Sequence, residues 1–125
     1  MTGLEAIRWA DSLAPNNYPP EQKIAWLSDL DGKFYREFLA RYEGADEEPP
    51  EPYADGSEEL LIPEPYARDV YVNWLLAKIA EANQEITLYN SHSTMFNTEY
   101  RSYCDLYNKE HKIKRPRCYG RRWTF

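Results

Sequence analysis

The chain has 125 residues and a formal net charge of −6, because 21 acidic side chains outnumber 15 basic ones. This length predicts one small domain, and no apolar run approaches the roughly 20 residues that a membrane-spanning helix requires. The N-terminus lacks a basic segment followed by an apolar one, so we expect a soluble protein without an export signal. Two cysteines make a poor disulfide framework, and we expect Cys104 and Cys118 to be free thiols in a reducing cytosol.

Charge is distributed unevenly along the chain. Residues 1–65 carry fifteen Asp and Glu against five Lys and Arg, a balance of −10, whereas residues 66–125 carry six against ten, a balance of +4. Eight of the acids lie within residues 43–59, and most of the late basic residues follow Asn108. The sequence therefore predicts an anionic loop in the middle of the chain and a cationic C-terminal tail.

Two helices are indicated before this loop. Thr2, followed three residues later by Glu5, is a capping box and predicts a short helix that Pro15 closes. The proline pair at 19–20 stands where a helix can begin without losing a needed backbone amide. Apolar side chains then recur at helical spacing, and we expect this second helix to end at Gly44.

The acidic segment 43–59 separates these helices from the second half of the chain. It contains three prolines and neither Lys nor Arg. Such a segment buries too little apolar area to offset the entropy lost on ordering, so we expect an exposed, mobile loop. The short apolar run 60–62 predicts an anchor after the loop, and a third helix begins at Glu64 or Pro65.

One helical stripe of large side chains dominates the second half. No Pro or Gly interrupts the chain between Pro65 and Asn108. The stripe, with steps of three and four residues, comprises Val72, Leu75, Ile79, Ala82, Ile86, Tyr89, Ser93, Phe96, Tyr100, Tyr103 and Tyr107. A single helix of this length would span roughly 60 Å, too long for a compact small domain. We expect a break at 90–93, where Asn and Ser cluster, with Asn83 as the second candidate.

These elements predict an all-α protein, a small four-helix bundle-like domain over residues 1–113 with a long acidic loop. An extended basic arm follows over residues 114–125. The later part of the stripe is rich in tyrosine, whose ring is apolar but whose hydroxyl needs a partner. Two interpretations stay open for this face: the core of the bundle, or a surface between subunits. Its residues are Tyr89, Phe96, Tyr100, Tyr103 and Tyr107.

Catalytic and metal-binding motifs are missing from the sequence. No Gly-rich phosphate loop, HExxH or GxSxG pattern occurs, and the run Ser91-His92-Ser93 is no nucleophile arrangement because adjacent helical side chains point apart. The His and Cys residues lack the short ligand spacing of a zinc site. We therefore expect a protein without enzymatic activity, metal or other cofactor.

Several runs resemble a known family. They are Ala10-Asp11 with Leu13, Pro15-Asn16, Trp26-Leu27 with Leu30-Asp31, Leu60-Leu61-Ile62-Pro63-Glu64-Pro65-Tyr66, then Ile79, Asn83, Glu85, Tyr89-Asn90, Phe96-Asn97, Tyr107-Asn108 and His111. In these runs, nearly to His111, the chain resembles the head–tail connector, or adaptor, proteins of tailed bacteriophages and prophages. It departs from their pattern at Ser91, where a second Asn is expected, and after Pro116, where no pattern matches.

The resemblance implies a virion structural protein that forms a roughly twelve-fold ring between portal and tail. Such a ring surrounds the channel through which double-stranded DNA leaves the head, and it performs no chemistry. The implied partners are further copies of the chain, the portal protein and a downstream head-completion or tail-terminator protein. The implied location is the neck of the virion, after assembly in the cytoplasm of the bacterial host.

Acidic side chains have two interpretations in this setting. The loop 43–59 is either a solvated linker, or its carboxylates belong to a channel lining that repels the phosphates of passing DNA. The second helix supplies further candidates for such a lining, namely Asp29, Asp31 and Glu37.

The basic tail has three interpretations. It is a docking arm, in which arginines pair with carboxylates of the portal or a neighbouring subunit while aromatic rings fill apolar pockets. Alternatively it is the working part of a small regulatory or nucleic-acid-binding helical module, with charges on phosphates and rings on bases, or a plain disordered terminus. The residues concerned are Arg115, Arg117, Tyr119, Arg121, Arg122, Trp123 and Phe125.

Overall fold

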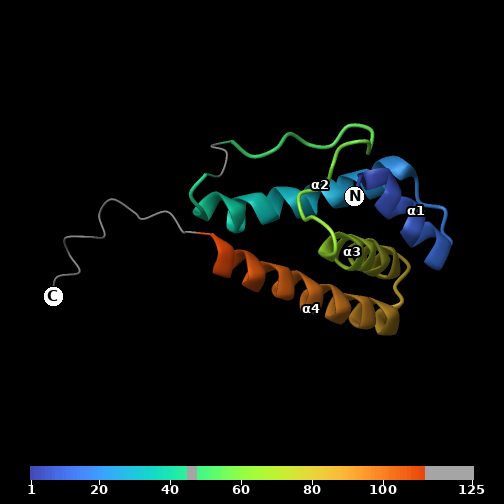
Figure 1. Cartoon of the computed structure of the whole chain (residues 1–125). Helices are drawn as coiled ribbons and strands as arrows, with labels where there is room; N and C mark the ends of the chain where they lie inside the picture. Colours follow the sequence, from blue (N-terminus) through green and yellow to red (C-terminus); the bar gives the residue numbers. More distant parts are fainter. Residues whose placement is uncertain (45–47, 112–125) are drawn as a thin grey trace, which may run out of the picture.

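Four α-helices carry the fold of the computed structural model, which describes residues 1–44 and 48–111 (Figure 1). They are α1 (Gly3–Leu13), α2 (Pro20–Glu37), α3 (Tyr66–Ala82) and α4 (Ile86–Glu110). A 3₁₀ turn, η1 (Leu39–Arg41), follows α2. Within the described residues no strand forms, and an isolated bridge joins Thr2 to Glu59. The prediction of an all-α fold with four helices is therefore confirmed.

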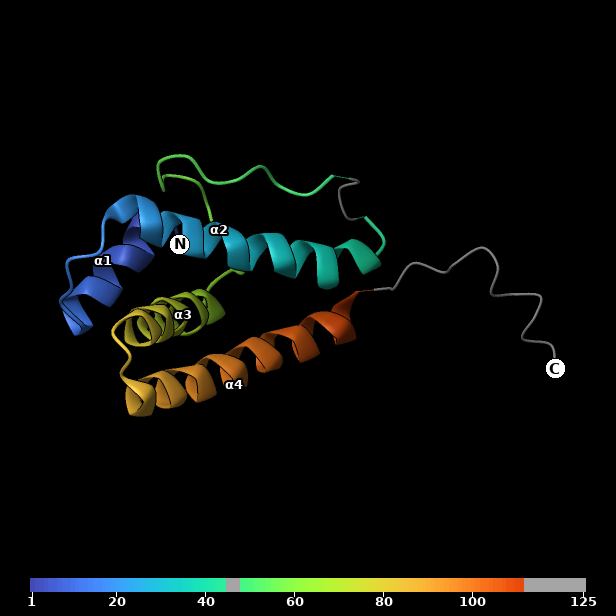
Figure 2. The ribbon, with the colours of Figure 1, turned by 180° about the vertical axis from the view of Figure 1, so that it is seen from behind.

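Helix α3 lies at the centre of the molecule. Figures 1 and 2 show it between α2 and α4, and α1 also packs against it. Its apolar side chains surround the helix instead of forming one stripe, and Val70, Tyr71 and Leu75 are completely buried. A helix that is apolar on several sides is stable only when neighbours cover each of them. The other three helices provide that cover.

The starts of α1 and α2 agree with their sequence signals. The Thr2 hydroxyl accepts the backbone N–H of Glu5 at 3.3 Å, and the Glu5 carboxylate accepts the N–H of Thr2 at 3.0 Å. Pro20 is the first residue of α2, where its missing N–H costs nothing. The predicted end of α2 at Gly44 is wrong, because the α-helix ends at Glu37. The chain then tightens into η1, which brings the ring of Tyr42 into the core with no exposed surface.

The break in the long stripe lies at Asn83, the second candidate. The preferred site at 90–93 is wrong, because α4 is continuous through it and its Asn90 and Ser91 side chains face solvent. At the observed break Gln84 has φ 60°, its N–H bonds the carbonyl of Glu81, and the N–H of Glu85 bonds that of Ala80. This is a Schellman ending, which satisfies the last carbonyls of α3. The chain thereby reverses within three residues.

The described part of the acidic loop, 48–59, is largely exposed, as predicted, and hydrogen bonds join it to the helices. The Tyr53 N–H bonds the Ser28 hydroxyl of α2 at 3.1 Å. Farther along, the Gly56 carbonyl accepts the N–H of Leu4 at 2.9 Å. Gly56 has φ +87°, and a Cβ there would come within 3.0 Å of the Leu4 side chain, so only glycine fits. Residues 60–62 then anchor the chain as predicted, since Leu60 and Ile62 are buried.

Candidate interaction surfaces

The aromatic face of α4 packs on the protein's own core. Tyr100 and Tyr103 contact Phe34 of α2, with ring centroids 5.7 and 6.0 Å apart. Tyr107 packs on Phe38 at 5.5 Å. Phe96 lies 5.2 Å from the Trp74 ring of α3. Four of the five predicted aromatic residues therefore pack against side chains of the same protein: Phe96, Tyr100, Tyr103 and Tyr107.

Burial governs the chemistry of this face. It raises the pKa of Tyr103 to about 12 and also raises the pKa of Tyr100, so both phenols remain protonated at neutral pH. Burial likewise raises the pKa of the Cys104 thiol, a free cysteine that follows Tyr103 in the sequence, and makes it a weak nucleophile. Tyr89, the fifth predicted residue, is half-buried near the start of α4.

The predicted channel acids occupy very different environments. Asp29 and Glu37 are exposed on α2, as a channel lining requires. Asp31 is 1 % exposed and therefore cannot line a solvent channel, which corrects the prediction for this residue. Its side chain points inward because it sits on the row of α2 that packs against α3, beside the buried Leu30 and Phe34. Asp31 instead contributes to the protein interior.

Asp31 is the centre of a buried polar network. Its Oδ1 accepts the Tyr71 hydroxyl at 2.5 Å, while Oδ2 accepts the Tyr53 hydroxyl and the Leu61 N–H, the latter at 3.0 Å. Tyr71 in turn accepts the Ile62 N–H at 2.9 Å. Burial raises the pKa of Asp31, and these donors counteract the rise. One carboxylate thereby joins α2, α3 and the end of the loop.

A surface groove that the sequence analysis missed opens between α1, α3 and α4. Its cavity volume is about 530 Å³, and its floor includes Leu76 of α3. Four large apolar side chains on its walls are 44 to 61 % exposed: Trp9, Leu13, Leu88 and Met95. The signal was present in α4, where Leu88 and Met95 recur at a seven-residue interval beside the tyrosine stripe. We call these four side chains and their surroundings the α1–α4 groove.

Four polar residues also line the groove: Arg68, Asp69, Asn73 and His92. The guanidinium of Arg68 lies over the Trp9 ring, 4.7 Å from its centroid. His92 points its Nδ1 inward without a hydrogen-bond partner, and burial lowers its pKa, which keeps the imidazole neutral. Together with the exposed side chains of Leu88 and Met95, the neutral histidine makes this part of the groove suitable for an apolar partner.

Other kinds of site are not formed by the described residues. Within 1–44 and 48–111 no three His, Cys, Asp or Glu side chains are grouped so that they could hold a metal ion. No described helix combines the length and apolarity needed to cross a membrane.

The predicted docking arm at 114–125, and with it the domain boundary at 113, lies outside the described residues. Comparison of the chain with protein-family models, curated proteins and solved structures finds no match.

Proposed function

We propose that this protein is a structural subunit of a tailed-phage virion, a head–tail connector that forms a ring between portal and tail. The α1–α4 groove is the observation that carries the proposal, because a cluster of exposed apolar side chains marks a site of protein association. A closed ring needs such a surface, since every copy must bind the next one through it. The partner of the groove is therefore a neighbouring copy of the chain.

The residues behind the family resemblance support this function through their places in the fold. Ile62 is completely buried, and Asn83 accepts the Tyr18 hydroxyl at 2.6 Å at the turn between α3 and α4. Tyr107 packs on Tyr42 with ring centroids 4.8 Å apart. These residues stabilise the helical scaffold that would present the contact surfaces of the ring.

The proposed assembly lies in the virion neck and lets double-stranded DNA pass without sequence recognition. The exposed carboxylates of Asp29 and Glu37 suit the channel side, because they repel DNA phosphates. The arm at 114–125 docks on the portal, and the opposite side of the ring receives a head-completion or tail-terminator protein. Assembly takes place in the host cytoplasm.

Measurement of mass by light scattering, with the purified protein alone and with portal, tests the proposal. We expect a monomer alone and a ring on the portal. The double variant Leu88→Asp with Met95→Asp is expected to remain folded, because both residues are about half exposed, at 46 and 52 %. It should lose ring formation, since two carboxylates in an apolar interface cannot be solvated.

Leu106→Asp is the matched control. Leu106 is also on α4 and is 38 % exposed, but it lies outside the groove, so its variant should assemble normally. Full assembly of the double variant would show that the groove is not the contact between copies. Failure of the unmodified chain to assemble, together with salt-dependent binding to short DNA, would instead favour a regulatory or nucleic-acid-binding helical module.

A further inference from the structure

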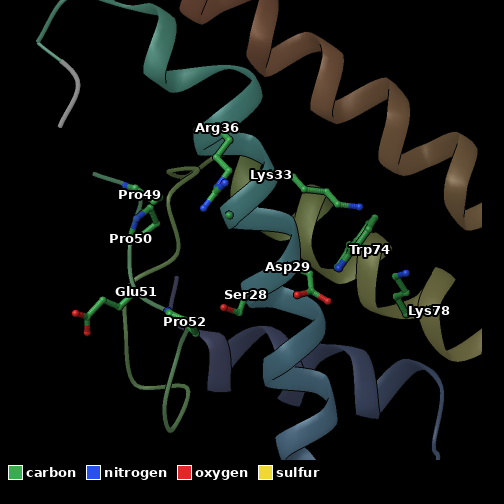
Figure 3. Close-up of a pocket in the computed structure, with 11 residues that line it drawn as sticks. Ser28, Asp29, Lys33, Arg36, Pro49, Pro50, Glu51, Pro52, Trp74 and Lys78 are labelled. Atoms are coloured by element: carbon green, nitrogen blue, oxygen red, sulfur yellow. The ribbon is translucent and has the colours of Figure 1, made fainter. Parts of the chain in front are cut away.

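A second cavity lies on another side of the molecule, between α2, α3 and the acidic loop (Figure 3). Its volume is about 580 Å³, within the range of roughly 300 to 1,000 Å³ that is typical of ligand sites. Gly32 and Arg36 of α2 line it, together with Trp74 and Lys78 of α3. Prolines of the loop, among them Pro50, form the facing wall.

The folded chain itself does not require a glycine at position 32. It lies in the interior of α2, where glycine is less favourable than alanine because it loses more conformational freedom on folding. Its φ is not positive, and a Cβ at this position would meet no atom within 4 Å. Neither backbone geometry nor internal packing therefore requires a glycine. The hollow that it leaves lies in the cavity and lets an external group approach the helix closely.

Cationic side chains surround this hollow without close carboxylate partners. Among the described residues, Lys33 and Arg36 form no ion pair within 4 Å. Lys78 lies 3.9 Å from Glu81, at the limit of an ion pair, and its ammonium stands 4.8 Å from the centroid of the Trp74 ring. Unpaired cations are notable in a chain with 21 acidic and 15 basic side chains. They leave a local positive charge that an anionic ligand can neutralise.

Internal contacts hold the Trp74 wall of the cavity in place. The indole N–H of Trp74 donates to the carbonyl of Trp26 at 2.8 Å, and the ring packs on Phe96. The opposite wall contains three prolines, whose φ angles are restricted. A wall that is held in place before binding loses little entropy when a ligand binds.

We propose that this cavity binds an extended acidic peptide segment of another protein, with carboxylates on Lys33 and Arg36 and its backbone over Gly32. Asp29 also lines the cavity, and Figure 3 shows it on the Trp74 side, whereas the Glu51 carboxylate points away from the helix. A peptide with spaced carboxylates can avoid Asp29. The continuous phosphates of a nucleic acid cannot, and the net charge of −6 repels them. This inference does not depend on the proposed ring.

Fluorescence anisotropy of a labelled oligoglutamate, titrated with the full-length protein, tests the proposal. We expect saturable binding that weakens as salt is added. Gly32→Leu fills the hollow and should weaken binding at least tenfold. It should also raise the melting temperature, by about 4 °C, because leucine favours a helix more than glycine does. A gain in stability with a loss of binding separates a ligand site from a structural one.

Reversal of the two cationic side chains is the second test of the proposed site. Lys33→Glu with Arg36→Glu should also lower affinity at least tenfold, while the same double reversal at the exposed residues Arg101 and Lys109 of α4 should leave it within twofold. The inference is overturned if oligoglutamate does not bind, if Gly32→Leu binds as tightly as the unmodified protein, or if oligoglutamine binds equally well. Tighter binding of short double-stranded DNA, lost in the Lys33 and Arg36 variant, would overturn it in favour of a nucleic-acid site.

Discussion

Removal of the buried carboxylate at Asp31 is the sharpest test of how this fold is stabilised. Asp31→Ala leaves three donors without an acceptor: the hydroxyls of Tyr71 and Tyr53 and the N–H of Leu61. Each unsatisfied buried donor costs about 1 to 3 kcal/mol. Relief from burying a charge offsets part of this loss, so we expect a net decrease of about 3 to 5 kcal/mol in the free energy of unfolding.

Asp31→Asn should lose less. Its amide oxygen can still accept the Tyr71 hydroxyl, but an NH₂ group replaces the Oδ2 that accepts the Leu61 N–H at 3.0 Å. The Leu61 N–H then faces another donor, which costs about 1 to 3 kcal/mol, whereas the Tyr53 hydroxyl can rotate to accept a hydrogen bond from the NH₂ group. Asp29→Ala is the control, because Asp29 is exposed on the same helix and its loss should change stability by at most about 0.5 kcal/mol.

Urea denaturation monitored by circular dichroism measures these differences. Equal stability of Asp31→Ala and Asp29→Ala would refute the role assigned to the network.

The pH dependence of stability gives an independent check. The folded pKa of Asp31 is raised above its ordinary value of 3.8, so the folded state holds this proton more tightly than the unfolded chain. The resulting stabilisation is fully present below pH 3.8 and is lost as the pH rises through the raised pKa. The free energy of unfolding of Asp31→Asn should lack this dependence on pH.

Three further outcomes are expected from local features. Thr2→Ala removes the hydroxyl of the capping box and should lower the free energy of unfolding by about 1 kcal/mol in the same denaturation assay, whereas no loss would argue against the cap. Gln84→Gly should raise it by up to about 1 kcal/mol, because Gln84 has φ 60° and glycine adopts that conformation without strain; a decrease would contradict this. Deletion of residues 114–125 should leave helicity unchanged and abolish attachment to the portal in a co-sedimentation assay, and retained attachment would disprove the docking arm.

Local signals in the sequence predicted local structure. The cap at Thr2 and the start of α2 at Pro20 depend on neighbouring residues alone, and both were correct. The end of α3 was harder to predict, because a left-handed C-terminal residue is usually Gly or Asn and here it is Gln84. The pairing of Tyr53 with Asp31 joins residues 22 positions apart and left no periodic trace in the sequence. The α1–α4 groove likewise results from the way helices pack together, and the second cavity also needs the loop that lies over α2.

The packing of α4 changes what its tyrosines are expected to do. Tyr100 stacks on Phe96 at 5.3 Å and meets Phe34 edge-on at 5.7 Å, so an interface on this face would require the bundle to open. In the proposed ring, contacts between copies should therefore use the other apolar row of α4, at Leu88 and Met95. Tyr100→Asp is expected to lower the free energy of unfolding by about 2 to 4 kcal/mol, as loss of a half-buried ring requires.

The contrast with the groove decides between the two faces. Met95→Asp should keep the stability of the unmodified protein and lose assembly, since Met95 is 52 % exposed and has little to lose on folding. Tyr100→Asp should lose stability first, and any loss of assembly should follow the fraction of unfolded protein. If Tyr100→Asp instead kept its melting temperature and failed to assemble, the tyrosine face itself would be the contact between subunits, and the internal packing would be too weak to hold the bundle closed.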